Sequence, residues 1–390
     1  MIRIGIDVGG THTVAAIMED DRVVLSFKAV TSTDVTTGVT EALTGVIEKS
    51  GVDPKSIDLG ALGTTHLTNA VVQRRDLTPT AAVRLGLPAT QALPPMVDWP
   101  LDLQEAIGAH AYFAHGGHEF DGREIPPVNA DELRKVGKDI ARKRIRAIAV
   151  SSVFSPINSE DERKAGEILA EASPGADITL SSDIGRIGLL ERENAGIMNA
   201  CLRDLSRVVI DAFRKALDAS GVSGRFFLTQ NDGTLMGAAF AERFPVLTFA
   251  SDPTNFIRGA AFLSGVKDGI VIDVGGTTTD VGSLHRGFPA RPLSPSRWAG
   301  CEPIFACPMC SRSALGAARW WLKTEPPERC RSARGPSDTS SPRTRSYSAA
   351  RRSPRATSSS PLAAPTSEIG PRRRISRRLS SRRRKPESWR

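Results

Sequence analysis

Ile6-Asp7-Val8-Gly9-Gly10-Thr11-His12-Thr13 occurs again as Ile272-Asp273-Val274-Gly275-Gly276-Thr277-Thr278-Thr279, with seven of the eight aligned positions identical. Each copy follows an apolar run and leads into another apolar stretch, which predicts a strand, a tight turn and a second strand. Two successive glycines allow positive φ and a close approach of the backbone to a ligand. Turn amides and threonine hydroxyls can donate hydrogen bonds to phosphate oxygens. The repeat therefore predicts two phosphate-binding hairpins.

The aspartate in each copy is placed to hold a water of Mg²⁺, because Mg²⁺ prefers carboxylate oxygens and keeps several waters. For one copy alone, an ordinary glycine hairpin is an equally good interpretation; two matching copies favour a nucleotide held between two halves of the molecule. We expect Asp7 and Asp273 to bind Mg²⁺ through water, and Asp280 either to position a water or nucleophile or only to cap the turn. The residues expected to contact the phosphates of ATP are Gly9, Gly10, Thr11, Thr13, Gly275, Gly276, Thr277 and Thr278.

Hydrophobic periodicity predicts strands that alternate with helices. Residues 3–28 are expected to form a three-stranded meander, and strands are expected at residues 57–62, 147–150 and 226–229. Helices are expected at residues 34–49, 129–142, 160–172 and 191–219, the third opened by a capping box at Ser159 to Glu162. The long helix should bury Ile197, Cys201, Leu205, Val208 and Phe213. Residues 79–129 are rich in proline and glycine, so we expect irregular structure there, with a hairpin at residues 116–125.

These elements predict an α/β fold with mixed sheets in two lobes. Together with the repeated hairpins, they resemble the actin, hexokinase and Hsp70 superfamily, whose ribonuclease H-like lobes hold ATP between two such hairpins. ATP, together with the Mg²⁺ expected at Asp7 and Asp273, is therefore the expected pair of cofactors.

Five separated phrases over about residues 1–289 narrow the resemblance to the hydantoinase/oxoprolinase family (N-methylhydantoinase A type). They include Gly63-Thr64-Thr65-His66-Leu67-Thr68-Asn69-Ala70 and Gln230-Asn231-Asp232-Gly233. The family resemblance implies an ATP-dependent enzyme that opens lactam or imide rings, such as hydantoins or 5-oxoproline. It also implies an N-terminal domain at residues 1–178, the start of an ATPase domain at residues 179–289, a possible B-type partner subunit and an oligomer. One departure is Ser251-Asp252-Pro253, where the family usually has glycine in the middle; a carboxylate there should weaken ATP binding.

Thr64, Thr65 and Asn69 open a predicted helix and could face the substrate or the γ-phosphate, or could only cap that helix. Asn231 and Asp232 could lie near the ligand or form an Asx turn. For three further groups, a structural role is the simpler interpretation. We expect exposed loop histidines at His110, His115 and His118, and surface residues at Arg192, Glu193 and Asn194. We expect a small core residue at Cys201.

The net charge of +9 is unevenly distributed. From Arg291 onward there are 21 arginines and 2 lysines against 6 acidic residues, a net charge of +17, so residues 1–290 carry −8. Such a basic segment cannot bury enough apolar surface to fold, so residues 290–390 are expected to be a disordered tail and the second lobe incomplete. We expect neither a zinc site at Cys307 and Cys310 nor a specific nucleic-acid arm in this segment. With no signal peptide or apolar span, a cytoplasmic location is expected.

The tail also has the features of an out-of-frame translation. A shifted codon consists of the third base of one codon and the first two bases of the next. At Trp298-Ala299 the shifted codon can only encode glycine, and at Met309-Cys310 and Trp320-Trp321 it can only encode valine. The intervening codons permit Gly-Gly-Val-Arg-Thr-Asp-Phe-Arg-Met-Pro-Asp-Val-Leu-Ser-Ile-Gly-Leu-Gly-Gly-Gly-Ser-Val-Val, which resembles the family's next segment. We therefore expect a frameshift at about Ala290 and poor activity of the 390-residue chain.

Four functions fit the sequence. The first is an ATP-dependent amidohydrolase subunit acting on a cyclic amide. A small-molecule kinase or a ketone carboxylase subunit of the same superfamily is the second. The third is a nucleotide switch without small-molecule turnover, and the fourth is an inactive decayed product.

Overall fold

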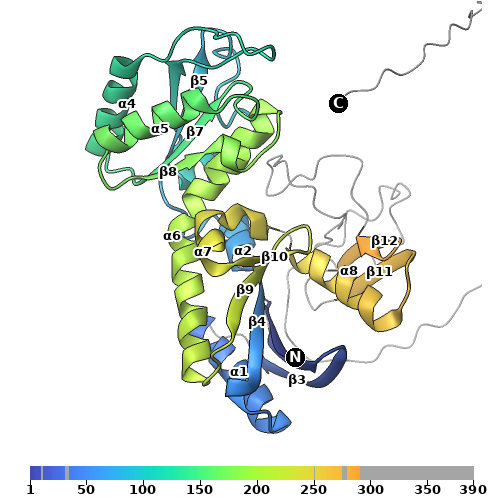
Figure 1. Cartoon of the computed structure of the whole chain (residues 1–390). Helices are drawn as coiled ribbons and strands as arrows, with labels where there is room; N and C mark the ends of the chain where they lie inside the picture. Colours follow the sequence, from blue (N-terminus) through green and yellow to red (C-terminus); the bar gives the residue numbers. More distant parts are fainter. Residues whose placement is uncertain (10–11, 31–34, 250, 275–278, 290–390) are drawn as a thin grey trace, which may run out of the picture. The chain divides into compact units, whose positions relative to one another are not determined.

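The computed structural model describes residues 1–9, 12–30, 35–249, 251–274 and 279–289, which form three sheets with helices packed against them (Figure 1). The first sheet has six strands in the order β10-β9-β4-β1-β2-β3. These strands are β1 (Ile2–Val8), β2 (His12–Glu19), β3 (Arg22–Val30), β4 (Ile57–Thr64), β9 (Arg225–Thr229) and β10 (Leu235–Gly237).

The first three strands form the predicted antiparallel meander, and β4 joins the other edge of β1 in parallel. Strand β9 then pairs in parallel with β4. The sheet therefore combines strands from both of the domains that the sequence predicts on either side of residue 178, and β1 lies between two partners. Alternate residues Ile4, Ile6 and Val8 of β1 are buried, as expected for a central strand.

Helix α1 (Val35–Ser50) packs against β2 and β3 with Val39, Leu43 and Val46 fully buried, as its 3.6-residue period predicts. It ends at Ser50, and the next residue, Gly51, has a φ of +69° in the left-handed region that favours glycine. The same core includes Phe213 and Leu217 from the C-terminal part of α6 (Leu189–Ala219).

The second sheet contradicts the expectation of irregular structure over residues 79–129. Strands β5 (Thr80–Leu87) and β6 (His110–His115) lie in that range and pair in parallel with each other, and the short helix α3 (Leu101–Ala106) lies between them. The order is β6-β5-β7-β8, with β7 (Ala147–Ser152) and β8 (Asp177–Leu180) also parallel. Strand β5 is buried on both faces and so shows no apolar alternation, which explains why the period failed to reveal it.

One of two local predictions near this sheet is confirmed and the other needs correction. The expected hairpin at residues 116–125 has an antiparallel bridge between His118 and Glu124, and backbone hydrogen bonds run from Glu119 N to Arg123 O at 2.7 Å and from Ile125 N to Gly117 O at 2.8 Å. Helix α5 (Glu160–Ala172) begins where predicted, but Ser159 makes no side-chain cap bond. Instead Glu162 is buried and accepts hydrogen bonds from Ser152 N at 2.8 Å and from Ser181 Oγ at 2.6 Å. Helix α4 (Ala130–Arg142) is capped by Asn129 as its sequence suggests.

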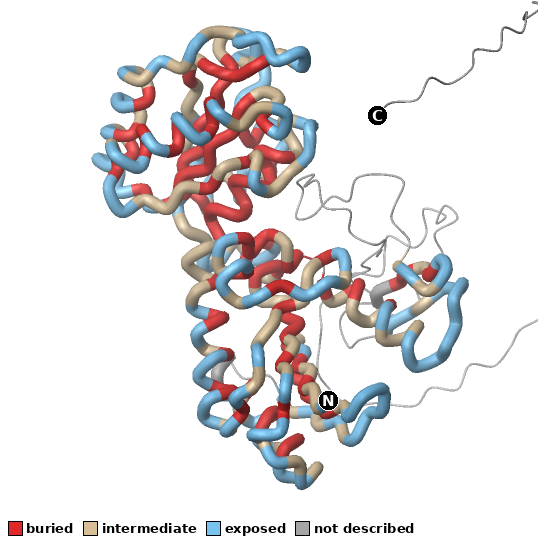
Figure 2. The backbone as a smooth tube through the Cα atoms, in the orientation of Figure 1, coloured by how far each residue is buried: buried red, intermediate tan, exposed pale blue. Residues whose placement is uncertain are grey.

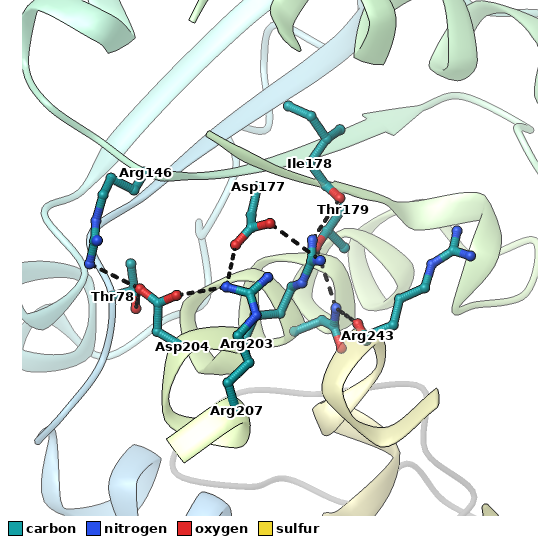
Figure 3. A network of polar contacts seen from close by, with 10 residues as sticks. Thr78, Arg146, Asp177, Ile178, Thr179, Arg203, Asp204, Arg207 and Arg243 are labelled. Atoms are coloured by element: carbon teal, nitrogen blue, oxygen red, sulfur yellow. Dashed lines mark hydrogen bonds and ion pairs between the residues drawn. The ribbon is translucent and has the colours of Figure 1, made fainter. Parts of the chain in front are cut away.

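The long helix α6 contributes to the cores of both larger sheets. Ile197 and Cys201 are buried near β7 and β8, but Val208 is 66% exposed, so its predicted place on the buried face is wrong. Figure 3 shows the ion pairs that join α6 to β8. Asp177 contacts Arg207 at 2.7 Å and Arg203 at 3.4 Å. Burial alone would raise the pKa of Asp177, but the Arg207 hydrogen bond and the nearby guanidinium charges lower it.

The third sheet has the order β11-β12-β13 and is antiparallel. Its strands are β11 (Gly269–Val274), β12 (Thr279–His285) and β13 (Phe288–Pro289). The helices α7 (Ala238–Arg243) and α8 (Ser251–Ser264) precede it, and α8 packs against β12 and β13. In the described parts of the chain, no helix is both long and apolar enough to cross a membrane.

Candidate functional site

Asp7 stands near the end of β1, between the two strands that pair with it. Its backbone lies opposite Val14 of β2 and opposite Gly63 of β4. Because β1 and β4 are parallel, the residues that follow both strands emerge at the same edge of the sheet. This edge therefore brings the first repeated hairpin together with the loop from Gly63 to Thr65.

The environment of Asp7 disfavours the ionised form of its carboxyl group. Its side chain is open to solvent, yet the protein atoms around it remove much of its hydration. This loss of hydration, together with the negative charge of Asp273, raises the pKa of Asp7 to about 6. Lost hydration is the larger cause, and the charge of Asp273 adds to it. A cation beside Asp7 would offset both effects.

Gly63 lies where three segments meet. A Cβ atom added to Gly63 would be 3.1 Å from Asp7 Oδ1, 3.1 Å from Asn255 Nδ2 and 3.8 Å from Asp252 Oδ1. Glycine is thus the residue that leaves room beside Asp7. Asp252, the predicted departure from the family, stands in the first turn of α8 near the Asp7 carboxylate.

A chain of hydrogen bonds fixes α8 to the first sheet. Asn255 Nδ2 donates to Thr229 Oγ1 at 3.0 Å, and Thr229 Oγ1 donates to the carbonyl of Leu62 at 3.2 Å. Asn255 and Thr229 were not identified from the sequence, because a single amide or hydroxyl without a repeated spacing gives no signal. Their contacts connect the strand that carries Gly63 to the helix that leads into the second hairpin.

Thr65 is held against the first hairpin. Its Oγ1 donates to the carbonyl of Val8 at 3.0 Å, and its backbone N–H reaches the same carbonyl at 3.4 Å. Thr65 is the residue before α2 (His66–Gln73) but makes no side-chain cap bond. Thr64 Oγ1 accepts from His66 N at 3.2 Å, whereas Asn69 donates its backbone N–H to Thr65 O within α2. Thr64 and Thr65 thus lie at the same edge of the first sheet as Asp7.

The remaining predicted phosphate contacts are described in part. Gly9 N–H donates to His12 O at 3.1 Å and closes the β1–β2 turn, and Thr13 is fully buried in β2. In the third sheet, the backbone of Asp280 lies opposite that of Asp273. The other six, namely Gly10, Thr11, Gly275, Gly276, Thr277 and Thr278, lie outside the described residues. Their phosphate contacts stay predictions.

In the loop at residues 230–233, Asp232 forms an Asx turn, whereas Asn231 is buried against α8. Asp232 Oδ1 accepts from Thr234 N at 2.9 Å and Oγ1 at 2.7 Å, which is an Asx turn. Asn231 is buried, and its carbonyl accepts from Thr254 Oγ1 of α8 at 2.7 Å. The loop therefore supports α8 from a second side.

Two predictions of surface residues are wrong. His118 is only 5% exposed and lies 3.6 Å from Asp161, although His115 is half exposed and pairs with Glu132. Arg192, Glu193 and Asn194 are buried because α6 inserts its first turns under the second sheet.

Glu193 forms a buried ion pair with Arg84 of β5, whose Nε lies 2.8 Å from Glu193 Oε1. Ser151 Oγ donates to the same carboxylate at 2.6 Å. Arg192 donates to the carbonyls of residues 186, 187 and 188 before α6 and to Ser181 Oγ. This network stabilises the second sheet and has no contact with Asp7 among the described residues.

The donor set near Asp7 suits Mg²⁺. In the described parts of the chain, no three His, Cys, Asp or Glu side chains gather closely enough to enclose a metal ion. Mg²⁺ does not need such an enclosure, because one or two carboxylates together with waters and substrate phosphates satisfy it. The pKa of Asp7 is raised first by lost hydration and second by the charge of Asp273, and a divalent cation held by the two carboxylates would offset both effects.

The chain matches two models of known protein families. Residues 3–173 match the hydantoinase/oxoprolinase N-terminal region, and residues 192–301 match the hydantoinase/oxoprolinase family model. The chain belongs to the hydantoinase/oxoprolinase family. The match to residue 301 extends past Pro289, where the quoted phrases of the sequence had placed the end of the resemblance.

The chain spans less than half the length of the curated relatives that it matches. It is 26% identical over 312 residues to caprolactamase subunit alpha of Pseudomonas jessenii, covering 73% of this chain and 43% of the relative. It is 25% identical over 334 residues to acetophenone carboxylase gamma subunit of Aromatoleum aromaticum, covering 74% and 44%. An uncharacterised protein of Methanocaldococcus jannaschii is 24% identical over 304 residues, also covering 74% and 44%.

Two solved structures share the fold. Nucleotide-free acetone carboxylase has a TM-score of 0.64 at 19% identity, covering 81% of this chain and 48% of that one. ATP-dependent caprolactamase from Pseudomonas jessenii also has a TM-score of 0.64 at 19% identity, covering 80% and 47%. The predicted actin-like α/β fold with mixed sheets is thereby confirmed.

Proposed function

We propose that this chain is the ATP-binding part of a hydrolase subunit that opens a lactam or imide ring of the hydantoin or 5-oxoproline type. The observation that carries the proposal is the setting of Asp7 at the first hairpin, where Gly63 leaves room beside Asp7 Oδ1 and where lost hydration, with the charge of Asp273, raises its pKa to about 6. The use of ATP is supported by the two solved structures that share the fold, because both the caprolactamase and the acetone carboxylase are ATP-dependent enzymes.

The chemistry addresses the weak electrophilicity of an amide carbonyl. The γ-phosphoryl group is transferred from ATP to the ring carbonyl oxygen, and ADP leaves. A first water then adds to the carbonyl carbon, and the ring C–N bond breaks as a proton from that water passes to the nitrogen. A second water hydrolyses the resulting acyl phosphate to the carboxylate and inorganic phosphate. Mg²⁺, when bound, would neutralise charge on the phosphates. Asp7 and Asp273 would hold it through water, and the hairpin amides and threonines would orient the phosphates. Thr64 and Thr65 would face the γ-phosphate or the ring, while Asp280 would position water.

The sequence of the relatives supports a second candidate, a ketone carboxylase subunit, because acetophenone carboxylase gamma subunit matches as well as caprolactamase subunit alpha does. A B-type partner subunit fits both candidates, since each relative is named as a subunit. Ring opening gives an amino acid and phosphate without bicarbonate, whereas carboxylation requires bicarbonate and a ketone.

The segment from about Ala290 is proposed to be read in the wrong frame, which would leave the second lobe incomplete and the 390-residue chain poorly active. The test is to restore the frame and assay hydantoin, 5-oxoproline and caprolactam with Mg·ATP, and acetophenone with bicarbonate. Phosphate release that depends on one ring substrate, with stoichiometric ring opening, supports the proposal. Dependence on ketone and bicarbonate supports the second candidate, and ring opening at full rate by the 390-residue form contradicts the frame interpretation.

A further inference from the structure

His66 is the first residue of α2 and follows directly on the strand beside Asp7. Thr64 lies opposite Val8 in the parallel pairing of β4 with β1, and Thr65 Oγ1 donates to the carbonyl of Val8 at 3.0 Å. The chain therefore turns into α2 next to the end of the strand that carries Asp7. An imidazole at this position can donate or accept a hydrogen bond, depending on which of its nitrogens carries the proton.

Helix α2 packs against α6 and leaves one of its faces uncovered. Leu67, Ala70 and Val71 are buried in the core that α2 shares with α6, and this part of the backbone is largely buried in Figure 2. His66 and Asn69 are three residues apart, so they share a face of the helix, and both are half-buried. The imidazole of His66 thus stands beside an amide on the uncovered face of the first turn.

The hydrogen bonds of Thr64 determine which ring nitrogen of His66 carries the proton. Thr64 Oγ1 accepts from His66 N at 3.2 Å and lies 3.1 Å from His66 Nδ1. The Thr64 side chain is buried, and within the described part of the chain Nδ1 is the one acceptor for its hydroxyl proton. Because a buried hydroxyl is destabilising unless its proton is bonded, the Thr64 hydroxyl donates to Nδ1. In the neutral ring the proton then resides on Nε2.

The Nε2–H group of His66 is available to a ligand. Burial lowers the pKa of His66, which favours the neutral imidazole. Nε2 has no hydrogen-bond partner among the described residues, and it is not one of the buried unpaired atoms, so solvent reaches it. The Thr64 hydroxyl and the lost hydration together leave a neutral ring with a single accessible donor.

We propose that His66 Nε2–H donates a hydrogen bond to a γ-phosphoryl oxygen of ATP, with Thr64 as the positioning residue that fixes the tautomer. A phosphoryl oxygen carries negative charge, whereas a ring carbonyl is neutral, and the N-terminal end of α2 also favours an anion. During transfer the charge spreads over the three equatorial oxygens, and a donor already held in place stabilises it. No proton leaves the ring in this role. The inference rests on the proposed function, because it assigns His66 to the nucleotide that this function requires.

Two substitutions separate the two nitrogens of the ring. His66→Gln keeps an N–H donor near the position of Nε2, whereas His66→Asn keeps one only near the position of Nδ1. Calorimetry measures the binding of the Mg²⁺ complexes of ADP and of the β,γ-imido analogue of ATP to the full 390-residue chain. We expect His66→Asn to weaken binding of the analogue by about tenfold and that of ADP by less than about twofold. His66→Gln should retain most of the affinity for the analogue, and the control His115→Asn, on β6 of the second sheet, should change neither affinity.

A measurement without nucleotide tests the tautomer separately, so the inference does not depend on how well one variant folds. ¹⁵N NMR of the histidine rings distinguishes the two neutral tautomers, and His66→Asn identifies the signals of His66. We expect the Nε2–H tautomer near neutral pH in the unliganded chain. Thr64→Val, which removes the hydroxyl but keeps the shape of the side chain, should allow the Nδ1–H tautomer to appear.

Three results would overturn the inference. They are the Nδ1–H tautomer in the unsubstituted chain, an unchanged affinity of His66→Asn for the analogue, and equal losses of affinity for ADP and the analogue, which would give His66 a structural role only. Failure of the proposed function has a different outcome, because the unsubstituted chain would then bind neither nucleotide. If both nucleotides bind and His66→Asn affects them alike, the contact with the γ-phosphate fails alone.

Discussion

The raised pKa of Asp7 makes nucleotide binding depend on pH in a defined way. A carboxyl group must be deprotonated to hold Mg²⁺, so affinity follows the fraction of Asp7 that is ionised in the free protein. With a pKa of about 6, that fraction falls to about one eleventh at pH 5. With the ordinary value of 3.8, it would remain at about nine tenths. The expected loss of Mg·ATP affinity between pH 8 and pH 5 is therefore about tenfold, compared with almost none for an ordinary aspartate.

Asp7 also connects pH to folding, with a sign that can be checked. Because the pKa of Asp7 is raised in the folded state, the folded chain holds the proton more tightly than the unfolded chain does. Its contribution to stability is complete below about pH 4 and is lost as the pH rises to about 6. Asp7→Asn should therefore stabilise the nucleotide-free chain at neutral pH by about 1–2 kcal/mol, a value reduced for the solvent exposure of this side chain.

Isothermal titration of Mg·ATP at several pH values measures the affinity, and ¹³C NMR of the carboxyl groups follows Asp7 directly through the signal that Asp7→Asn removes. Asp273→Asn should lower the pKa of Asp7 without restoring the ordinary value, because loss of hydration is the larger cause. Asp218→Asn, at an exposed position on α6, is the control and should change neither quantity. A carboxyl titration of Asp7 near pH 4 that is unaffected by Asp273→Asn would refute the reasoning.

Three further predictions concern the site and its support. Gly63→Ala places a methyl group 3.1 Å from Asp7 Oδ1 and should weaken Mg·ATP binding by about tenfold. The control is Gly259→Ala, whose methyl group meets nothing within 4 Å and should leave the affinity unchanged. Equal Mg·ATP affinities of the two variants in a titration would contradict this prediction. Asp252→Gly should strengthen Mg·ATP binding by removing both bulk and charge, and Asp252→Asn should recover only the part due to charge; no gain from either variant would show that Asp252 does not oppose the nucleotide. Glu193→Ala leaves Arg84 buried and unpaired, so urea unfolding should show a loss of about 3–5 kcal/mol, compared with less than about 0.5 kcal/mol for exposed Glu167→Ala. A loss below about 1 kcal/mol for Glu193→Ala would contradict the role given to this ion pair.

The parts of the fold that the sequence predicted are those with a clear period or a capping signal. The β1–β3 meander alternates apolar and polar residues, and α1 repeats its apolar residues every three or four positions. Strand β5 was missed because burial on both faces erases alternation, and because nearby prolines suggested a loop. Arg192 and Glu193 were misplaced because a charged pair at a helix start looks like a solvent-exposed turn unless its partners, such as Arg84, are known.

The candidate site divides in the same way. The acids and glycines were found because they occur twice, and repetition is visible in one sequence. Gly63 was found through its motif, although its contact with Asp7 depends on the parallel register of β1 and β4. Asn255 and Thr229 act through the two hydrogen bonds that join α8, β9 and β4, and only their positions in space connect them to that edge. The environment of Asp7 likewise depends on Asp273, which is distant in sequence.

The central claim is that Asp7 and Asp273 hold the same metal–nucleotide complex. A double-mutant cycle of Asp7→Asn and Asp273→Asn tests it most directly, with Mg·ATP affinity measured by calorimetry in the frame-restored chain. We predict that each single variant weakens binding and that the two losses are coupled by about 0.5–3 kcal/mol, as expected for groups that share a ligand. Strictly additive losses, or a loss from only one of the two variants, would contradict it.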